Sequence, residues 1–437
     1  MAIIGIGAIL LCMPVSSASG EFTSPITALF VATSATCVTG LTTVDTGIYW
    51  SGFGQGVILA MIQVGGLGFM SLAMIFSVLL KRHVSPKERV IFIKSMNLST
   101  ADGLIPFSKK VVTFAFSAEA IGAAMLAVRF VPLFGWAKGI KYSVFHAVSA
   151  FCNAGFDLLG SEHGAFAGFA PYADDVYLNV VLCLLIISGG LGFIVWNNVF
   201  SCLKEKSRLS FYSKLAIFTT LGLIVFGTAA FALLEWNNPN TVGGADSAVG
   251  KLIRSLFQSV TLRTAGFSTI PQGELSGGSK LISMLLMFIG GSSGSTAGGI
   301  KTVTAALVVI ATVNIIKGNR DVNFRRHQFD KDAVSRAFAL VSTGLAAAVG
   351  GGMLIRVTDG SGAISLTSAL YEAFSAFGTT GVTVGITTGL SVFGQLVVIG
   401  LMFFGRIGIT TIMYAILIGS SGQQKLFSYP HAQVPIG

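Results

Sequence analysis

A short glycine-centred segment occurs four times in this 437-residue chain, at nearly equal intervals. The central glycines lie 115, 111 and 115 residues apart; they are Gly40, Gly155, Gly266 and Gly381. A half-length apolar segment leads into each copy, and a long apolar run with glycines near its middle follows it. Internal similarity at a fixed period indicates one structural unit used several times. The sequence therefore predicts four similar repeats in tandem.

The composition is that of a membrane protein. Apolar residues make up 53% of the chain and charged residues 11%, whereas soluble domains carry roughly 25% charged residues. A helix needs about 20 apolar residues to cross a bilayer, so we expect about eight transmembrane helices. Seven candidates lie near residues 55–80, 110–132, 176–200, 214–235, 279–316, 334–356 and 393–420. The eighth, residues 2–17, is short for a span and lacks the charged start of a signal peptide, so we interpret it as a shortened first helix.

Each repeat has the same predicted layout of outer helix, short pore helix, glycine loop and inner helix. The pore helices are too short to cross and too apolar for an external loop, so we expect them to be re-entrant. They lie near residues 25–36, 141–151, 249–262 and 366–377. The predicted fold is an all-α membrane protein with four tandem helix–pore-loop–helix repeats around one pseudo-fourfold pore. The expected boundaries are 1–80, 81–213, 214–333 and 334–420 for the repeats, and 421–437 for a C-terminal tail.

The positive charges are concentrated in three segments. Residues 81–110, 201–214 and 317–336 hold seven, four and six Lys or Arg, which is 17 of the 28 in the chain. By the positive-inside rule these segments are cytoplasmic, so the glycine loops enter from outside and both termini lie inside. The segments determine topology, and docking of a partner is the alternative use. A short surface helix is expected after Ser85-Pro86.

The glycine loops combine the features of a site for a monovalent cation. Backbone carbonyls can replace the water shell of such an ion without adding net charge, and glycine permits the positive φ that turns successive carbonyls the same way. None of the four loops contains Asp or Glu, so a carboxylate ring for divalent ions is not expected, and K⁺ suits the site best. The predicted selectivity filter comprises Val38, Thr39, Gly40, Asn153, Ala154, Gly155, Thr264, Ala265, Gly266, Thr379, Thr380 and Gly381.

The third inner helix is interrupted by a polar, glycine-rich segment. Five glycines in ten residues cannot remain helical at roughly 1 kcal/mol per glycine, and a break at membrane depth must face water or protein. We interpret the segment as a gate below the filter, together with two nearby positively charged side chains, Lys301 and Arg406. The predicted gate residues are Gly290, Gly291, Ser292, Ser293, Gly294, Ser295, Thr296, Ala297, Gly298, Gly299, Lys301 and Arg406.

Arg406 lies within an apolar helix, where a central arginine costs about 2.5–3.5 kcal/mol and needs a partner. We expect it either to be satisfied by carbonyls as a structural residue or to hold the 290–299 segment across the pore. Lys301 has a similar role or extends toward the cytoplasm. Glu119 and His146 are expected to be hydrogen-bonded interior side chains, and Asp157 to attract cations to the outer mouth.

Enzymatic motifs in the gate segment are incomplete. Gly290-x-Ser292-x-Gly294 has the spacing of a hydrolase nucleophile elbow, but no strand–turn–helix context accompanies it. Gly294 to Thr302 lacks the Gly-Lys adjacency of a phosphate loop. The five cysteines are scattered and have no metal-type spacing. We therefore expect no enzyme and no cofactor.

The loops and their flanks resemble the ion-conducting subunits of the bacterial Ktr potassium uptake systems, within the Trk/Ktr/HKT superfamily. The residues that carry this resemblance are Cys37–Leu41, Cys152–Phe156, Arg263–Phe267, Phe377–Val382, Gly290–Thr302 and Phe404–Gly408. The resemblance implies a homodimer in a bacterial cell membrane and a cytoplasmic nucleotide-binding regulatory ring of the KtrA type, with residues 429–437 between protomers. No nucleic acid is implied. Each loop has one glycine where tetrameric potassium channels have two, so we expect looser selection of K⁺ over Na⁺.

Three alternatives remain open at the level of sequence. The chain could be a Trk-type potassium transporter subunit or a less selective Na⁺/K⁺ transporter, with Na⁺ as a coupled ion. A secondary transporter also uses broken helices, but such folds usually contain two inverted repeats, whereas the four repeats here are parallel. Flux of K⁺ and Na⁺ into liposomes separates these possibilities.

Overall fold

The computed structural model describes residues 1–68, 104–319, 321–325, 327–359 and 364–408. Within these residues the chain is almost entirely helical, with one two-residue hairpin, β1 (Asn323–Phe324) and β2 (His327–Gln328). The expected all-α class is confirmed. The surface helix expected after Ser85 and the C-terminal tail lie outside the described residues.

The outer helices of repeats two to four are long apolar helices. They are α7 (Leu104–Phe134), α12 (Phe211–Glu235) and α16 (Lys331–Thr358), and each is long and apolar enough to cross a membrane. The corresponding helix of the first repeat, α1 (Ala2–Cys12), is shorter. Ser210 caps α12 by accepting a hydrogen bond from Ser213 N–H at 3.2 Å, which satisfies an amide that the first helical turn leaves free.

Four half-length helices precede the glycine loops, as predicted. They are α2 (Pro25–Cys37), α8 (Trp136–Phe151), α13 (Ala248–Thr261) and α17 (Leu366–Gly378). Each is amply buried toward its C-terminal end and packs against the outer helix of its own repeat. The C-terminal ends carry the negative end of the helix dipole, so four such ends approach the glycine loops.

The inner helices all end at or near a glycine. They are α4 (Gly52–Leu67), α10 (Val176–Leu191), α14 (Gly277–Phe288) and α18 (Val392–Ile407). Sequence predicted one continuous inner helix over 176–200; instead α10 and α11 (Phe193–Glu205) meet at Gly192 with a bend of 95°. Gly192 has φ +90° and ψ +148°, a region of backbone conformation that essentially only glycine occupies. The predicted inner helix over 279–316 is interrupted as expected, and α15 (Thr302–Ile316) follows the break.

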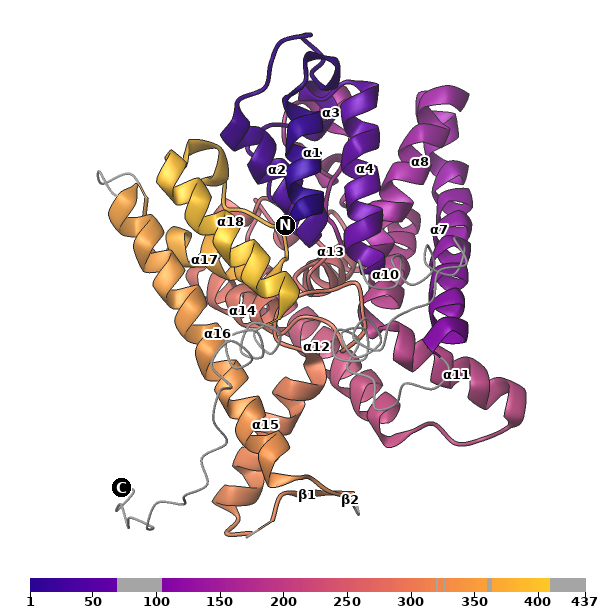
Figure 1. Cartoon of the computed structure of the whole chain (residues 1–437), viewed down its shortest axis with the longest axis vertical. Helices are drawn as coiled ribbons and strands as arrows, with labels where there is room; N and C mark the ends of the chain where they lie inside the picture. The colour runs from indigo at the N-terminus through magenta and orange to yellow at the C-terminus, as the bar shows by residue number, and fades with distance from the viewer. Residues whose placement is uncertain (69–103, 320, 326, 360–363, 409–437) are drawn as a thin grey trace.

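Contacts between helices join the four repeats into a ring, and Figure 1 labels the helices involved. Each inner helix contacts the pore helix of the next repeat: α4 contacts α8, α10 contacts α13, α14 contacts α17, and α18 contacts α2. The last of these pairs joins the end of the described chain to its beginning. A ring of four similar units leaves one shared axis, as the pseudo-fourfold prediction requires.

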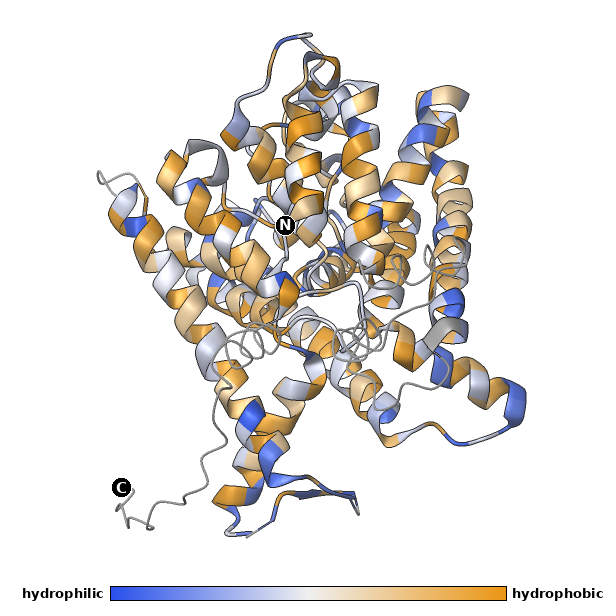
Figure 2. Cartoon of the chain, in the orientation of Figure 1, coloured by the Kyte–Doolittle hydropathy of each residue, from blue (hydrophilic) through white to orange (hydrophobic). Residues whose placement is uncertain are grey.

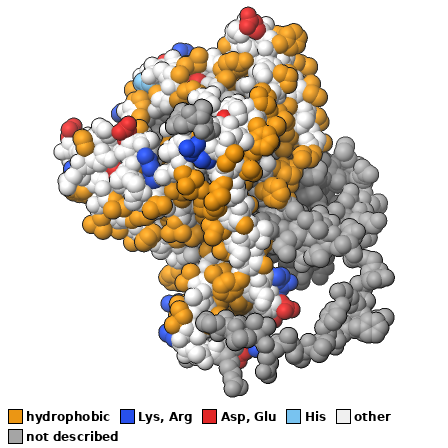
Figure 3. All heavy atoms as spheres, turned by 90° about the vertical axis from the view of Figure 1, so that its left-hand side faces the viewer, with side chains coloured by type: hydrophobic (Ala, Val, Ile, Leu, Met, Phe, Trp, Pro, Cys, Tyr) orange, Lys and Arg blue, Asp and Glu red, His pale blue; other side chains and the backbone are white. Residues whose placement is uncertain are grey.

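The outer surface of the helical body is apolar. Figure 2 shows hydrophobic residues along the long helices and hydrophilic residues at the lower end, on α11 and around the β1–β2 hairpin. The face that contains α16 carries many exposed hydrophobic side chains (Figure 3), including Leu345, Met353, Leu354 and Val357. Exposed apolar surface of this extent is what a lipid-facing helix presents.

Candidate functional site

The four glycine loops meet at one point of the structure. A Cβ atom placed on Gly40 would lie 2.5 Å from the Ala154 carbonyl oxygen, and one on Gly155 would lie 2.8 Å from the Ala265 oxygen. A Cβ on Gly266 would lie 2.6 Å from the Thr380 oxygen, and one on Gly381 would overlap the Thr39 oxygen. Each loop thus touches the next in cyclic order, and the fourth touches the first. The structure brings together all twelve residues that sequence predicted for the filter.

The loops share one backbone conformation. Each has a left-handed residue two positions before its glycine, and the glycine itself has positive φ. The first of these positions holds Val38 (φ 57°), Asn153 (φ 61°), Thr264 (φ 64°) and Thr379 (φ 51°). Left-handed non-glycine residues are uncommon and are stabilised by surrounding contacts. Their recurrence in all four loops indicates that the same local geometry is needed four times.

Pore-helix carbonyls hold the loop amides in place. Thr39 N–H donates to Ser34 O at 2.8 Å, Ala154 N–H to Ser149 O at 2.7 Å, and Thr380 N–H to Ser375 O at 2.8 Å. Ala265 N–H donates to Thr261 O at 2.9 Å. Because the amides bond backward to the pore helices, the loop carbonyls are left without amide partners among the described residues. The carbonyl oxygens are therefore free to face the axis.

Four buried threonine hydroxyls at the loops also have no hydrogen-bond partner among the described residues. They belong to Thr39, Thr264, Thr379 and Thr380. A buried hydroxyl without a partner costs roughly 1–3 kcal/mol. Free carbonyls and free hydroxyls around one axis are the oxygen ligands that a monovalent cation needs when it leaves water. The donor set fits K⁺ or Na⁺ as a transported ion.

The glycine-rich segment 290–299, the predicted gate, is called the gate loop below, and it lies against the predicted filter. Its two ends are joined, since Gly290 N–H donates to Ile300 O at 2.9 Å and Thr302 N–H donates to Gly291 O at 3.0 Å. Thr296 Oγ1 donates to Phe151 O at 3.2 Å and contacts Asn153 Oδ1 at 3.1 Å. A Cβ on Gly298 would overlap the Thr379 side chain. The gate loop thus touches filter residues directly.

Backbone amides attach the gate loop to the inner helices of other repeats. Ser292 N–H donates to Gly190 O at 3.0 Å and Thr296 N–H to Gly189 O at 3.3 Å. Gly299 N–H donates to Gly405 O at 3.2 Å. Glycines permit close packing of helices, and here Gly189, Gly190 and Gly405 of the inner helices also accept hydrogen bonds from the gate loop.

Arg406 donates to two carbonyls, Thr296 O in the gate loop and Gly65 O in the first inner helix. Arg406 therefore contacts segment 290–299. Both interpretations of Arg406, as a structural residue and as part of a gate, are compatible with these bonds, so its role in gating stays a prediction. Lys301 Nζ donates to Ala297 O at 2.7 Å, so its ammonium group is directed to the gate loop. The structure therefore brings the charged side chains of Lys301 and Arg406 to the same ten-residue segment.

Arg263 was not predicted as a site residue, although it lies next to a filter loop. Its side chain is buried, and its Nη2 donates to Gly290 O at 3.1 Å, where the gate loop begins. Among the described residues it has no carboxylate partner, and its Nε has no hydrogen bond. The signal for it in the sequence was an arginine at membrane depth, which marks a functional position by default.

The other three ionisable residues singled out from the sequence, Glu119, His146 and Asp157, are hydrogen-bonded. Glu119 accepts from Gln63 Nε2 at 2.9 Å and from the Cys152 thiol at 3.7 Å. His146 Nε2 accepts from Leu158 N–H at 3.3 Å. Both agree with the structural interpretation of these residues. Asp157 is half-buried just after the second filter loop and accepts from Leu159 N–H at 3.0 Å; its predicted effect on cations stays a prediction.

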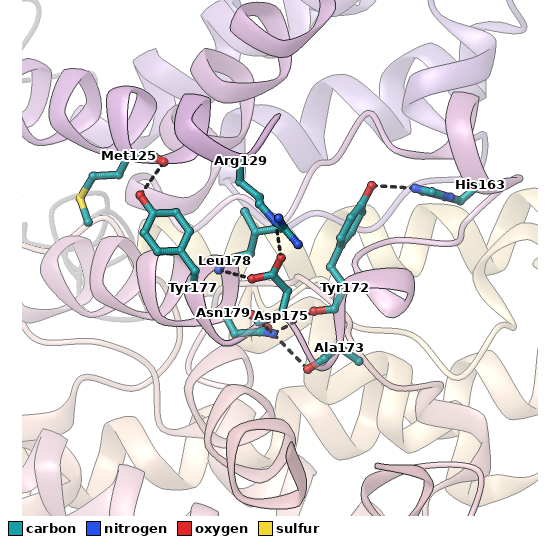
Figure 4. A network of polar contacts seen from close by, with 9 residues as sticks. All are labelled: Met125, Arg129, His163, Tyr172, Ala173, Asp175, Tyr177, Leu178 and Asn179. Atoms are coloured by element: carbon teal, nitrogen blue, oxygen red, sulfur yellow. Dashed lines mark hydrogen bonds and ion pairs between the residues drawn. The ribbon is translucent and has the colours of Figure 1, made fainter. Parts of the chain in front are cut away.

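The segment between the second glycine loop and α10 contains a polar network (Figure 4). Asp175 caps α10 by accepting from Leu178 N–H at 3.1 Å and pairs with Arg129 at 2.7 Å. Tyr172 Oη lies 2.9 Å from His163 Nε2. In α9 (Gly160–His163), hydrogen bonds from Tyr142 and then from Lys138 hold the pKa of Glu162 below its ordinary value. These contacts fix the loop that follows the filter.

Comparison with known proteins gives concordant results. A family described as TrkH, cation transport protein, matches residues 1–427. The chain is 40% identical over 99% of its length to the potassium/sodium uptake protein NtpJ of Enterococcus hirae, covering 94% of that protein. It is 37% identical over 99% of its length to the Ktr system potassium uptake protein B of Bacillus subtilis, also covering 94%.

The fold has a solved counterpart. The crystal structure of the potassium transporter TrkH from Vibrio parahaemolyticus matches 95% of this chain and 83% of its own, with a TM-score of 0.72 and 16% sequence identity. At this identity the likeness concerns the fold. The sequence relatives are ion transporters, in agreement with the prediction that the chain is not an enzyme. With a match over nearly the whole length, the chain belongs to the TrkH family of cation transport proteins.

Proposed function

We propose that this protein takes up K⁺ across the cell membrane of a bacterium, through a filter formed by the four glycine loops. The proposal rests on the cyclic contact between the four glycine loops. Each loop glycine lies against the carbonyl oxygen of the residue just before the glycine of the next loop; the four are Gly40, Gly155, Gly266 and Gly381. Buried threonine hydroxyls without partners among the described residues add further oxygens at the same place. The names of the relatives, which refer to potassium uptake, point to the same ion.

The gate loop is the proposed barrier to conduction. It lies against Asn153 and Thr379 of the filter, and Arg406 and Lys301 donate hydrogen bonds to its carbonyls. A ten-residue segment with five glycines has little intrinsic order, so these external bonds determine its position. Removal of the bonds opens the pathway.

A less selective Na⁺/K⁺ transporter is the second candidate function. One relative is named a potassium/sodium uptake protein, and each filter loop has a single glycine. Counted over the three predicted filter residues of each loop, there is one glycine per loop. With such a short filter, fewer carbonyl rings contribute to the discrimination between ions. Na⁺ would then compete with K⁺ for the same site or accompany it.

The proposed assembly is a homodimer with a separate cytoplasmic regulatory ring that binds nucleotide. The relatives named Ktr system proteins B and D are components of a system, which supports a second subunit. The ring is proposed to dock on segments 81–110, 201–214 and 317–336, which are strongly basic. We also propose that both termini lie on the same, cytoplasmic side. Co-purification of the regulatory subunit tests the docking, and native mass spectrometry of the detergent-solubilised chain tests the dimer.

Uptake of ⁸⁶Rb⁺ into liposomes that contain the purified chain tests transport. We expect uptake driven by a K⁺ gradient, and competition by Na⁺ that is weaker than competition by K⁺. Equal competition by Na⁺ supports the second candidate. Absence of flux for either ion, with the folded protein in the bilayer, contradicts both.

The gate is tested by Arg406→Ala and by deletion of residues 292–298. Both should raise ⁸⁶Rb⁺ flux, by about tenfold or more for Arg406→Ala, because hydrogen bonds from a charged donor are worth about 1.5–3 kcal/mol. Arg208→Ala, in the exposed linker before α12, is the matched control and should leave flux unchanged. Unchanged flux in both gate variants contradicts the gate.

A further inference from the structure

A cavity of about 640 Å³ lies between α7 and α11, and its lining includes no residue of the four glycine loops or of the gate loop. This volume falls within the range of about 300–1,000 Å³ that is typical of small-molecule sites. The cavity is open on one side, and its lining mixes lysines with aromatic rings. The residues used below are Lys109, Lys110, Phe114, Trp196, Phe200 and Lys204.

The bend at Gly192 creates this cavity. Because α11 departs from α10 by 95°, it runs sideways at the lower end of the molecule, next to the lower end of α7 (Figure 1). Lys110 Nζ donates to Asn197 Oδ1 at 3.2 Å and joins the two helices. The rings of Trp196 and Phe200 lie 5.2 Å and 5.8 Å from the Phe114 ring. One wall of the cavity is therefore apolar and aromatic.

The mouth of the cavity is positively charged. Lys109, Lys110 and Lys204 are exposed side chains of its lining, and Glu205 is the acidic residue among the described lining residues. Among the described residues, none of the three ammonium groups forms a salt bridge within 4.0 Å. Three lysines against one carboxylate leave a net positive charge, which favours an anionic occupant.

The position in the membrane identifies the class of anion. Segments 81–110 and 201–214 belong to the basic side of the chain, which is the proposed cytoplasmic side. The cavity is lined by α7 and α11, and Figure 2 shows hydrophilic residues on α11, at the lower end of the helical body. In the proposed orientation this level is where the helical body meets the inner leaflet. Basic pockets between helices at this level bind the headgroups of anionic lipids. A soluble phosphate would use the lysines and leave the aromatic wall exposed to water.

We propose that this cavity binds an anionic phospholipid of the inner leaflet. The phosphate lies among Lys109, Lys110 and Lys204, and an acyl chain packs on Phe114, Trp196 and Phe200. The site is separate from the filter and the gate loop, and its occupancy does not require ion flux.

The cavity wall is connected to the gate loop. Phe193, which lines the cavity, donates its N–H to Gly294 O at 2.9 Å. Tyr212 Oη, at the start of α12, donates to Ser293 O at 3.1 Å. A lipid that holds α11 against α7 also holds Phe193, and so favours the present position of the gate loop. This coupling rests on the proposed gate, whereas the lipid site does not.

Brominated lipids test the site, because bromine quenches nearby tryptophan fluorescence and Trp196 lines the cavity. In nanodiscs, dibromo-phosphatidylglycerol should quench wild-type fluorescence more than dibromo-phosphatidylcholine does. The difference should disappear in Trp196→Phe. In Lys109→Gln/Lys110→Gln/Lys204→Gln, retention of phosphatidylglycerol should fall by about a hundredfold, since each lysine contributes about a factor of five.

The matched control is Lys206→Gln/Lys214→Gln/Lys317→Gln, which removes the same charge from exposed lysines on the same side of the chain but outside the cavity. All variants are measured as the purified chain, without the proposed regulatory ring. It should retain the difference between the two lipids, and millimolar inorganic phosphate should not abolish it. Equal quenching by both lipids overturns the site, as does full retention in the cavity variant. Reversal by inorganic phosphate shows a soluble anion site and overturns the lipid assignment.

Flux measurements test the coupling separately. In liposomes that contain phosphatidylglycerol, the cavity variant should show severalfold higher basal ⁸⁶Rb⁺ flux than the control variant. If Arg406→Ala raises flux and the cavity variant does not, the coupling is wrong while the gate stands. If lipid preference is present and neither variant changes flux, the proposed gate fails and the lipid site stands.

Discussion

At the scale of single residues, the proposed filter depends on the absence of side chains at four positions. A Cβ on Gly155 would lie 2.6 Å from Gly266 Cα, and no real Cβ tolerates backbone so close. The neighbouring backbone cannot move away, because pore-helix carbonyls hold the loop amides. Glycine at these positions is therefore required by both φ and space.

Gly155→Ala should reduce ⁸⁶Rb⁺ flux by about tenfold or more, because the left-handed conformation costs about 1–2 kcal/mol and the added methyl displaces carbonyls of the filter. Uptake into liposomes measures the effect. Gly56→Ala in α4 is the control, since nothing lies within 4 Å of its Cβ position. Similar flux in the two variants would contradict the placement of Gly155 in the filter.

Arg263 should act through the gate loop and not through the ions. Its guanidinium holds Gly290 O, so Arg263→Gln should raise basal flux by about tenfold while the preference for K⁺ over Na⁺ is unchanged. Arg263→Lys, which keeps one charged donor, should lie between wild type and Arg263→Gln. Arg254→Gln, at the outer ion pair with Asp174, serves as control. A changed ion preference with unchanged basal flux would place Arg263 in the filter instead.

At the scale of elements, short helices depend on their caps and on the loops that join them. The α10 helix begins at Asp175, whose carboxylate accepts from Leu178 N–H and pairs with Arg129 (Figure 4). Arg129 is 52% exposed, so its ion pair contributes at most about 1 kcal/mol, and the cap contributes a similar amount. The cap therefore matters at least as much as the visible salt bridge.

Asp175→Ala should lower the Tm of the detergent-solubilised protein by about 2–4 °C, as expected for a loss of 1 kcal/mol or more. Arg129→Ala should lower it less, because the cap remains. Asp246→Ala, at an exposed position before α13, is the control and should have no effect. Equal losses in the Asp175 and Arg129 variants would show that the ion pair dominates.

The interruptions of the inner helices were only partly predictable at this scale. Segment 290–299 was recognised from its five glycines, whereas the sharp bend at Gly192 was not. The segments around Gly68 and Gly192 have similar sequences, and in both the helix ends at a glycine with positive φ. A pair of adjacent glycines is compatible with a packed helix or with a break, and tertiary contacts decide between them.

At the scale of the whole molecule, the distribution of Lys and Arg along the chain predicts which end of the protein faces the cytoplasm. The exposed linker between α11 and α12 and the β1–β2 hairpin lie at the hydrophilic end of the chain (Figure 2). The loops that follow the filter lie at the other end. This arrangement makes the two ends chemically distinguishable.

A membrane-impermeant maleimide should label Asp246→Cys in intact cells and Ser207→Cys only after permeabilisation. Both positions are exposed, so access depends on the side of the membrane and not on burial. The native cysteines Cys37, Cys152 and Cys183 are buried, and the parent protein gives the background. The reverse labelling pattern would invert the proposed topology.

The sequence by itself determined the membrane class, the four repeats, the twelve residues of the candidate filter and the interrupted third inner helix. These properties are local, since they depend on runs of apolar residues, on charge counts and on glycines that permit unusual φ. Tertiary structure decided the cyclic order of the loops, the bend at Gly192, the partners of Arg263 and the individual carbonyls that Arg406 binds. Those contacts use backbone carbonyls, which every residue carries, so no pattern of side chains in the sequence specifies which carbonyl is bound.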